Sequence, residues 1–257
     1  MQRLLALVLG SLLASCAVAA ELLVKVPFVV EGRVAFIIAA PQPATGKPWV
    51  WYAPTLGANL PGSDHQWYFE RFIQAGVSMA GIDLGEVRGS PESTALFDAF
   101  HGEMVRRGYS AQPVLLGQSR GGLMMLSFAM RHPDKLRAFA GIYPVCNLTS
   151  WPLLRSKPAV LADYGLPEAE LMARLSDYNP MDNLTRLAAR RVPMFIVHGD
   201  SDVVVPLDEN GGLLRQRYES LGGPITIKVI RDEGHKVSPS FFECQELVDF
   251  VLSHHSK

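Results

Sequence analysis

The fold follows from one stretch, Gly117-Gln118-Ser119-Arg120-Gly121-Gly122, which fits the pattern Gly-x-Ser-x-Gly. It directly follows the apolar run Val114–Leu116 and directly precedes a segment with helical spacing. The glycines permit a sharp turn that presents the Ser119 side chain at the carboxyl edge of a sheet, and the helix N-terminus behind it supplies free backbone N–H groups. The stretch therefore predicts a strand, a tight turn carrying a nucleophile, and a helix.

Short apolar runs and helical segments alternate on both sides of this turn, as in α/β proteins. Strands buried on both faces are predicted at Trp49–Ala53, Val77–Asp83, Pro113–Gly117, Phe139–Val145, Met194–His198 and Ile225–Ile230. Helices are predicted at Trp67–Gln74, Ser93–Arg107, Gly122–Arg131, Gly212–Leu221 and Phe241–Ser253. The alternation predicts an α/β fold whose central sheet is mostly parallel, with helices on both faces.

Two segments depart from this alternation. Between Leu22 and Ala40, two β-rich runs flank a turn at Glu31-Gly32, which predicts an antiparallel hairpin at the start of the domain. From Asn147 to Arg191 there is no clear strand, but there are several prolines and a helical patch near Pro167–Leu175. We expect residues 147–191 to form a small helical cap inserted in a domain spanning 21–257.

A serine hydroxyl becomes a strong nucleophile only when a base takes its proton and a third group orients that base. The acid and the base are expected downstream, in that order. Asp202 lies in the loop after the run Met194–His198, and Asp200 is the alternative acid, although its place nearer the strand end favours a role in fixing the loop. His235 follows the last predicted strand and can reach back to Ser119, whereas His198 is expected to be a structural strand-end residue.

Three stretches, Gly117–Gly122, His198–Pro206 and Gly234-His235, resemble the α/β-hydrolase superfamily. The likeness is to its prolyl-oligopeptidase-like and acyl-esterase branch, where a His-Gly-x-x-Asp-x-x-Val-Pro motif carries the acid. The resemblance covers the chain from about Trp49 to its end. It implies an α/β-hydrolase fold and serine hydrolase chemistry, with neither a metal nor an organic cofactor.

Carried over residue by residue, the resemblance makes Ser119 the nucleophile, Asp202 the orienting acid and His235 the general base. The Arg120 N–H is expected to be the first donor of the oxyanion hole. The second donor is where this chain departs from the family, which often has His-Gly after its third strand; here the stretch reads Ala53-Pro54-Thr55-Leu56-Gly57. By position we assign that donor to the Leu56 N–H, with Thr55 as the alternative.

Three side chains near the motif are candidate substrate contacts. The Arg120 guanidinium is expected either to hold a substrate carboxylate, as the Ser-Arg of glucuronoyl esterases suggests by resemblance, or to pair with a buried acid such as Asp83 or Glu86. Tyr143 and Trp151 are either an aromatic wall for a sugar or aryl group, or ordinary packing residues.

The N-terminus has the pattern of an export signal. Arg3 is followed by the apolar stretch Leu4–Leu13 and then by mostly small residues from Ser15 to Ala20, which predicts a signal peptide over residues 1–20 and a secreted or periplasmic protein. Leu13-Ala14-Ser15-Cys16 also resembles a bacterial lipobox, and lipidation of Cys16 would instead anchor the protein to a membrane.

Composition narrows the function classes further. The chain has 257 residues, of which 48% are hydrophobic and 19% charged, and its formal net charge is −1. These values exclude a disordered chain and give no basic excess for nucleic-acid binding. Cys146 and Cys244 remain after processing, either as a disulfide or as two separate buried thiols, and neither has the spacing of a zinc site.

The sequence therefore predicts an exported serine hydrolase that cleaves carboxylic esters, either a small ester or an acyl group on a carbohydrate. A chain of this length has no room for the gating propeller of a full oligopeptidase, which favours esters over peptides. A serine peptidase with the same triad is one alternative. A non-catalytic surface lipoprotein on the same fold is another, because fold does not fix function.

Overall fold

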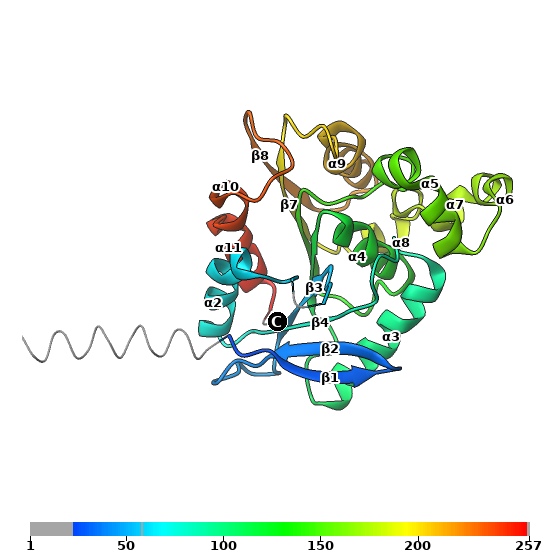
Figure 1. Cartoon of the computed structure of the whole chain (residues 1–257). Coiled ribbons are helices and arrows are strands. Elements are labelled where there is room, and N and C mark those ends of the chain that lie inside the picture. The colour runs from blue at the N-terminus through cyan, green and yellow to red at the C-terminus, as the bar shows by residue number, and fades with distance from the viewer. Residues whose placement is uncertain (1–22, 58, 256–257) are drawn as a thin grey trace, which may run out of the picture.

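The computed structural model describes residues 23–57 and 59–255 (Figure 1). The predicted signal peptide, residues 1–20 with Cys16, lies outside the described residues. In the part of the chain that is described, no helix combines the length and the apolar character needed to cross a membrane.

A sheet of eight strands within the described residues forms the centre of the molecule, in the order β1-β2-β4-β3-β5-β6-β7-β8. The strands are β1 (Val26–Val30), β2 (Arg33–Ile38), β3 (Trp49–Ala53), β4 (Ser78–Ile82), β5 (Val114–Gln118), β6 (Ala138–Ile142), β7 (Met194–Gly199) and β8 (Ile225–Ile230). β2 runs antiparallel to both β1 and β4, and every other pairing is parallel. This arrangement confirms the predicted α/β class and the opening hairpin.

The strands differ in burial because of their places in the sheet. Every residue of β3, β4, β5, β6 and β7 is buried, as expected for strands covered on both faces. β8 was expected to be buried in the same way, but its residues are half-buried or exposed. The reason is its position at the edge of the sheet, where only β7 pairs with it.

Helices cover both faces of the sheet (Figure 1). One apolar core contains side chains from α3 (Pro91–Arg106), α4 (Arg120–Arg131), α8 (Thr185–Ala189) and α9 (Gly211–Ser220). The core on the opposite face contains side chains from α2 (Gln66–Gln74), α10 (Pro239–Phe242) and α11 (Gln245–Ser253). The two cores together bury both faces of the parallel strands.

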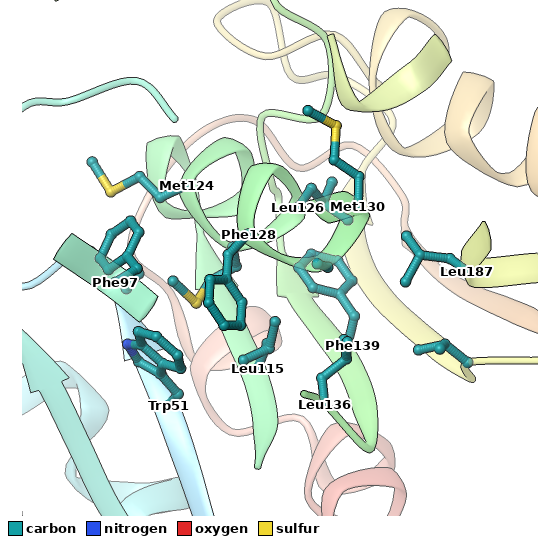
Figure 2. Close-up of a cluster of buried hydrophobic side chains, with 14 of the residues drawn as sticks. Trp51, Phe97, Leu115, Met124, Leu126, Phe128, Met130, Leu136, Phe139 and Leu187 are labelled. Atoms are coloured by element: carbon teal, nitrogen blue, oxygen red, sulfur yellow. The ribbon is translucent and has the colours of Figure 1, made fainter. Parts of the chain in front are cut away.

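Aromatic side chains pack α4 onto the sheet (Figure 2). The Phe128 ring of α4 lies with its centroid 4.9 Å from that of Trp51 on β3. Phe97 of α3 meets the same Trp51 edge-on, at 5.6 Å. All three side chains are nearly or fully buried, so α4 sits on a rigid layer that sets the position of its N-terminus.

Two predicted elements differ from expectation: one strand ends early, and one helix is divided in two. The run Phe139–Val145 stops being a strand at Ile142, because Tyr143 has a positive φ of 34° and is followed by Pro144, which has no N–H for a strand ladder. The predicted helix Phe241–Ser253 is two helices, α10 and α11. The backbone of Cys244 between them is extended, with φ −78° and ψ 103°.

Short helices fill most of the segment between β6 and β7 where the cap was predicted. They are α5 (Trp151–Tyr164), α6 (Glu168–Ala173), α7 (Leu175–Tyr178), η2 (Pro180–Asp182) and α8. α5 is kinked at Ser156, where φ is −142°. Pro158 explains the kink, because proline inside a helix cannot donate the usual backbone hydrogen bond and its ring displaces the preceding turn.

Candidate active site

Ser119 occupies a strained turn between β5 and α4, as its motif predicts. Its φ is +49°, a value that non-glycine residues seldom adopt. The neighbouring glycines permit the turn because the backbone is crowded there. A Cβ at Gly121 would lie only 2.0 Å from the Ala53 carbonyl oxygen, and one at Gly122 would lie 2.4 Å from the Pro144 ring. The turn holds Ser119 above the carboxyl edge of the parallel strands.

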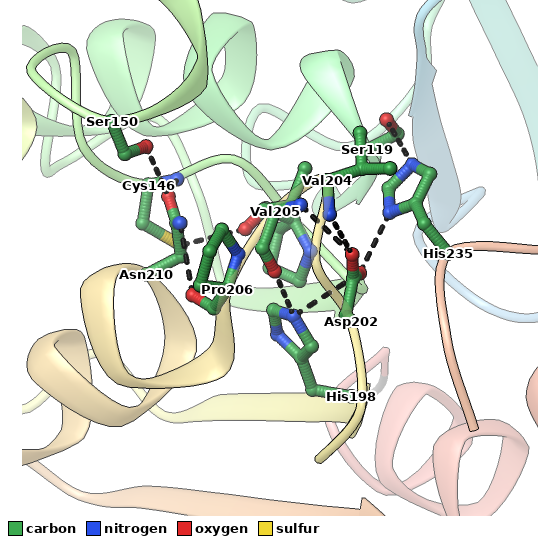
Figure 3. Close-up of polar contacts among 11 residues, drawn as sticks. Ser119, Cys146, Ser150, His198, Asp202, Val204, Val205, Pro206, Asn210 and His235 are labelled. Atoms are coloured by element: carbon green, nitrogen blue, oxygen red, sulfur yellow. Dashed lines mark hydrogen bonds and ion pairs between the residues drawn. The ribbon is translucent and has the colours of Figure 1, made fainter. Parts of the chain in front are cut away.

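The structure brings the three predicted residues Ser119, His235 and Asp202 into one chain of hydrogen bonds (Figure 3). Ser119 Oγ is 2.9 Å from His235 Nε2, and His235 Nδ1 is 2.7 Å from Asp202 Oδ2. A carboxylate oxygen can only accept, so Nδ1 carries the proton and Nε2 is free to accept the Ser119 hydroxyl proton. This is the geometry that a general base needs next to a nucleophile.

Asp202 is buried and kept ionised by its neighbours. Its Oδ1 accepts the backbone N–H groups of Val204 and Val205, at 2.9 and 2.8 Å. Burial acts to raise the pKa of this carboxyl, but the hydrogen bonds from His198, His235 and Val205, with the charge of His235, outweigh it. The pKa of Asp202 is therefore held well below its ordinary value.

His198 and Asp200 fix the loop around this acid, as their places near the strand end suggested. The fully buried His198 donates from Nε2 to the Val205 carbonyl at 2.8 Å, and the same nitrogen lies 3.6 Å from Asp202 Oδ2. Asp200 Oδ1 accepts the Asp232 N–H at 2.8 Å. The alternative assignment of Asp200 as the orienting acid has no contact to His235 to support it.

A buried polar network lies directly behind the nucleophile, and the sequence analysis did not anticipate it. The Gly62 N–H donates to His65 Nδ1 at 3.1 Å, so the proton of this ring is on Nε2, which donates to Gln118 Oε1 at 2.7 Å. The Tyr52 hydroxyl donates to the same oxygen at 2.6 Å. Burial lowers the pKa of His65, in agreement with a neutral ring. The only signal in the sequence was the position of Gln118 inside the motif.

Tyr143 joins this network to the predicted base. Gln118 Nε2 donates to the Tyr143 hydroxyl at 3.3 Å, and the Tyr143 ring lies 4.4 Å from the imidazole of His235, centroid to centroid. The ring is 2% exposed, and burial raises the pKa of its hydroxyl. Tyr143 therefore packs beneath His235 and supports its orientation.

Arg120 forms an ion pair with Glu86, which is one of the two partners foreseen for it. Its guanidinium also lies 5.9 Å from the centre of the Trp151 ring at the start of α5. A second ion pair follows in the same loop, where Arg88 contacts Asp163 of α5 at 2.6 Å. The arginine beside the nucleophile is thus already paired, through a loop that is tied to the helices of the predicted cap.

The Leu56 N–H, our positional choice for the second oxyanion donor, is engaged within its own loop. It donates to the Leu60 carbonyl at 3.3 Å, and Gly57 donates to Asp83 Oδ2 at 2.6 Å. The stretch after β3 forms a small closed loop because these bonds turn its N–H groups inward.

The two cysteines do not form a disulfide: Cys146 and Cys244 are free, buried thiols.

A small cavity of about 210 Å³ opens over the nucleophile. Its walls come from the loop after β3, the nucleophile turn, the end of β6 and the loop after β8. They consist of Pro54, Leu60, Gln118, Ser119, Arg120, Tyr143, His235, Lys236 and Val237. Trp151, predicted as a possible wall residue, does not line it. Among residues 23–57 and 59–255, no group of three or more His, Cys, Asp or Glu side chains is placed to hold a metal ion.

Solved structures with the same fold include a peptidase and an ester hydrolase. A puromycin-hydrolyzing peptidase of Mycobacterium tuberculosis superposes with a TM-score of 0.70 at 15% identity, over 90% of this chain and 39% of its own. The chain thus spans about two fifths of that protein. An S-formylglutathione hydrolase from Agrobacterium tumefaciens gives a TM-score of 0.65 at 13% identity, over 91% and 94% of the two chains.

The class defined by fold and site is therefore the α/β-hydrolases. The sequence profile of the prolyl oligopeptidase family matches residues 103–255, more than half of the chain, and the chain belongs to this family. It is a serine hydrolase. No curated protein matches it in sequence.

Proposed function

We propose that this serine hydrolase cleaves carboxylic esters with a small acyl group, using Ser119, His235 and Asp202. The observation that carries the proposal is the hydrogen-bonded chain from Ser119 Oγ through His235 to Asp202, in which Ser119 and His235 line a cavity of about 210 Å³. Pockets for drug-sized ligands have volumes of about 300–1,000 Å³. The smaller space over Ser119 suits a short acyl group, with the alcohol part of the ester outside it.

In the proposed reaction, Ser119 Oγ attacks the acyl carbon while its proton moves to His235 Nε2. The bond between the acyl carbon and the alcohol oxygen then breaks, and that oxygen takes the proton from Nε2. Water attacks the acyl-enzyme in the same way, the acid leaves, and Ser119 regains its proton. Asp202 holds the Nδ1–H throughout and offsets the charge on the imidazole.

We propose the Arg120 N–H as the donor to the oxyanion. Arg120 is the first residue of α4, where backbone N–H groups have no partner within the helix. The Leu56 N–H would have to leave the Leu60 carbonyl before it could serve as a second donor. Tyr143 is proposed to contact the acyl group, because it lines the same cavity as Ser119.

Peptide hydrolysis is the second candidate, and the family match favours it. Turnover of 4-nitrophenyl acetate and of an aminoacyl 4-nitroanilide, measured side by side with Ser119→Ala as control, separates the two. Ester turnover that depends on Ser119, with little anilide turnover, supports the proposal. Faster turnover of the anilide would establish a peptidase. No turnover of either, with Ser119 unreactive to a fluorophosphonate, would favour the non-catalytic alternative.

We further propose that the protein is exported and acts outside the cytoplasm. The support is the N-terminal order of one basic residue, an apolar stretch and small residues up to Ala20. Mass spectrometry of the processed N-terminus tests this. A start near Glu21 indicates soluble export, a lipidated Cys16 indicates a membrane anchor, and a retained Met1 contradicts export.

A further inference from the structure

A second, larger cavity lies beside the nucleophile and is not used by the proposed reaction. Its volume is about 530 Å³, within the range of small-molecule sites. One wall is formed by η1 (Ser63–His65) and α2, and the other by the segment leading into α10 and just past it. The lining residues are Ser63, Asp64, Gln66, Trp67, Glu70, Val237, Ser238, Pro239, Phe242 and Glu243.

This cavity adjoins the site around Ser119. Val237 lines both cavities, two residues after His235. Phe242 in the wall of the larger cavity lies 6.2 Å from the Tyr143 ring, centroid to centroid, and Tyr143 lies 4.4 Å from His235. Because Val237 is common to both linings, the two cavities adjoin, and the larger one is the neighbouring space for a group bonded to an acyl carbon at Ser119.

The lining combines an aromatic ring with many hydrogen-bonding groups. Trp67 is half-buried, and its indole is held in place by Arg71, whose guanidinium carbon lies 3.4 Å from the ring centre and whose Nη1 donates to the Trp67 carbonyl. Trp67 lines the cavity together with hydroxyls, an amide and carboxylates. Aromatic rings contact the C–H groups of a sugar, while carboxylate and amide groups bind its hydroxyls.

The three carboxylates do not by themselves make a site for a cation. Asp64 and Glu243 are exposed, and an exposed charge pair at about 4 Å in water contributes only about 1 kcal/mol. Glu70 already accepts a hydrogen bond from Gln66 Nε2 at 2.6 Å. An indole flanked by hydrogen-bond acceptors and an amide is a lining that suits a neutral, hydroxyl-rich ligand.

We propose that this cavity binds a neutral sugar ring, which forms the alcohol part of the ester that Ser119 cleaves. The inference rests on the proposed ester hydrolysis and names its substrate class, an O-acylated saccharide. Trp67 contacts the ring, and Glu70 and Gln66 accept and donate hydrogen bonds to its hydroxyls. The short acyl group occupies the smaller cavity over Ser119.

Two measurements test this inference, and the first does not depend on catalysis. In a Ser119→Ala background, xylobiose, cellobiose and mannobiose are titrated by calorimetry. We expect saturable binding of at least one, weakened about tenfold or more by Trp67→Ala and unchanged by Leu154→Ala, which removes an exposed side chain of α5 (72% exposed). A tenfold change corresponds to about 1.4 kcal/mol.

The second measurement uses the active enzyme with 4-nitrophenyl acetate and with the mono-O-acetyl ester of the disaccharide that binds best. We expect Trp67→Ala, and the isosteric Glu70→Gln, to raise KM for the acetylated disaccharide while leaving kcat/KM for the aryl acetate nearly unchanged. Circular dichroism verifies that both variants are folded. If the aryl ester is also not cleaved, the proposed function fails, and the titration still decides the inference.

Three outcomes would overturn the inference. One is the absence of saturable binding of any of the three disaccharides at millimolar concentration. Another is an equal effect of Trp67→Ala on the aryl acetate and on the acetylated disaccharide. The third is preferential binding of benzylamine that disappears at about 1 M salt, where the Debye length is only about 3 Å, because this would identify the cavity as a site for cations.

Discussion

His198 Nε2 donates to the carbonyl oxygen of Val205 at 2.8 Å, and this bond closes the loop that carries Asp202. The two carboxylate oxygens of Asp202 therefore have different hydrogen-bond partners. One oxygen accepts hydrogen bonds from backbone N–H groups within the loop, and the other accepts the hydrogen bond from His235 Nδ1 and lies 3.6 Å from His198 Nε2. The bond fixes the direction in which Asp202 points, so His198 acts on the proposed base through the acid.

Replacing His198 tests this relationship. His198→Leu leaves the buried Val205 carbonyl without a donor, which costs about 1–3 kcal/mol of the free energy of unfolding. Because the loop that carries Asp202 is then less fixed, we expect kcat for the aryl ester to fall about tenfold. His198→Gln places an amide N–H at similar reach and is expected to restore a substantial part of kcat. Urea unfolding and steady-state kinetics measure the two effects.

A purely structural role for His198 predicts something different. In that case both variants lose stability, but each folded enzyme keeps the kcat of the parent. The shape of the pH profile of kcat/KM separates the two roles as well, because only displacement of Asp202 from His235 shifts the acidic limb.

Ser119→Ala removes the proposed nucleophile without disturbing the surrounding hydrogen bonds of the turn. We expect ester turnover to fall by at least about 10³-fold, as in other triad enzymes. The midpoint of thermal unfolding stays close to that of the parent, because within the described residues the Ser119 hydroxyl makes one hydrogen bond, to His235. Thr149→Ala serves as a control for loss of a partly buried hydroxyl away from the site. Retention of activity by Ser119→Ala would show that another residue is the nucleophile.

The low pKa of Asp202 makes stability depend on pH in a defined direction. A carboxyl whose pKa is depressed in the folded protein stabilises the fold above its unfolded value, near 3.8, and this stability is lost as pH falls toward the folded value. The parent should therefore exceed Asp202→Asn in free energy of unfolding at pH 6, and this difference should shrink steadily below about pH 4. Urea unfolding between pH 2 and pH 6 measures it; a constant difference across that range would contradict the assignment.

The fold could be predicted from the sequence because its main signals are local. Runs such as Trp49–Ala53 are short and continuously apolar, which indicates buried strands. A Gly-x-Ser-x-Gly sequence between a strand and a helix indicates a sharp turn that presents the serine side chain. The reach of His235 to Ser119 was predictable for a related reason: in a parallel sheet, the loops at the carboxyl ends of the strands meet at one edge. Edge position, which exposes β8, depends on strand order and is not visible in a single strand.

The second layer of the site could not be predicted because it depends on pairings between distant residues. Tyr52, His65 and Gln118 lie on three different elements, and only folding places their polar atoms within 2.7 Å of one another. The Leu56 N–H was assigned by counting from β3, whereas its bond to the Leu60 carbonyl depends on how that loop closes. The partner of Arg120 was left open for the same reason.

The buried network behind the nucleophile gives a graded prediction. Tyr52→Phe removes one donor to Gln118 Oε1, which still accepts the His65 N–H, so we expect a loss of about 1 kcal/mol in unfolding free energy. In Gln118→Leu, the buried His65 N–H and the Tyr52 hydroxyl can hydrogen-bond only to each other. We therefore expect a larger loss of unfolding free energy than in Tyr52→Phe. Thermal and urea unfolding of both variants measure this order, and a larger loss for Tyr52→Phe would contradict the proton assignment on His65.

The ion pair between Arg120 and Glu86 predicts how the enzyme treats substrates that carry a carboxylate. Because Glu86 already neutralises the guanidinium, the parent should show little preference for a uronate methyl ester over an uncharged methyl ester of similar size. Glu86→Gln frees Arg120 and should lower KM for the uronate. The two side chains are 38% and 31% exposed, so solvent screening limits the gain to about 1 kcal/mol, or about fivefold. The uncharged ester provides the control, and an equal change in KM for both esters would show that Arg120 has no contact with the substrate carboxylate.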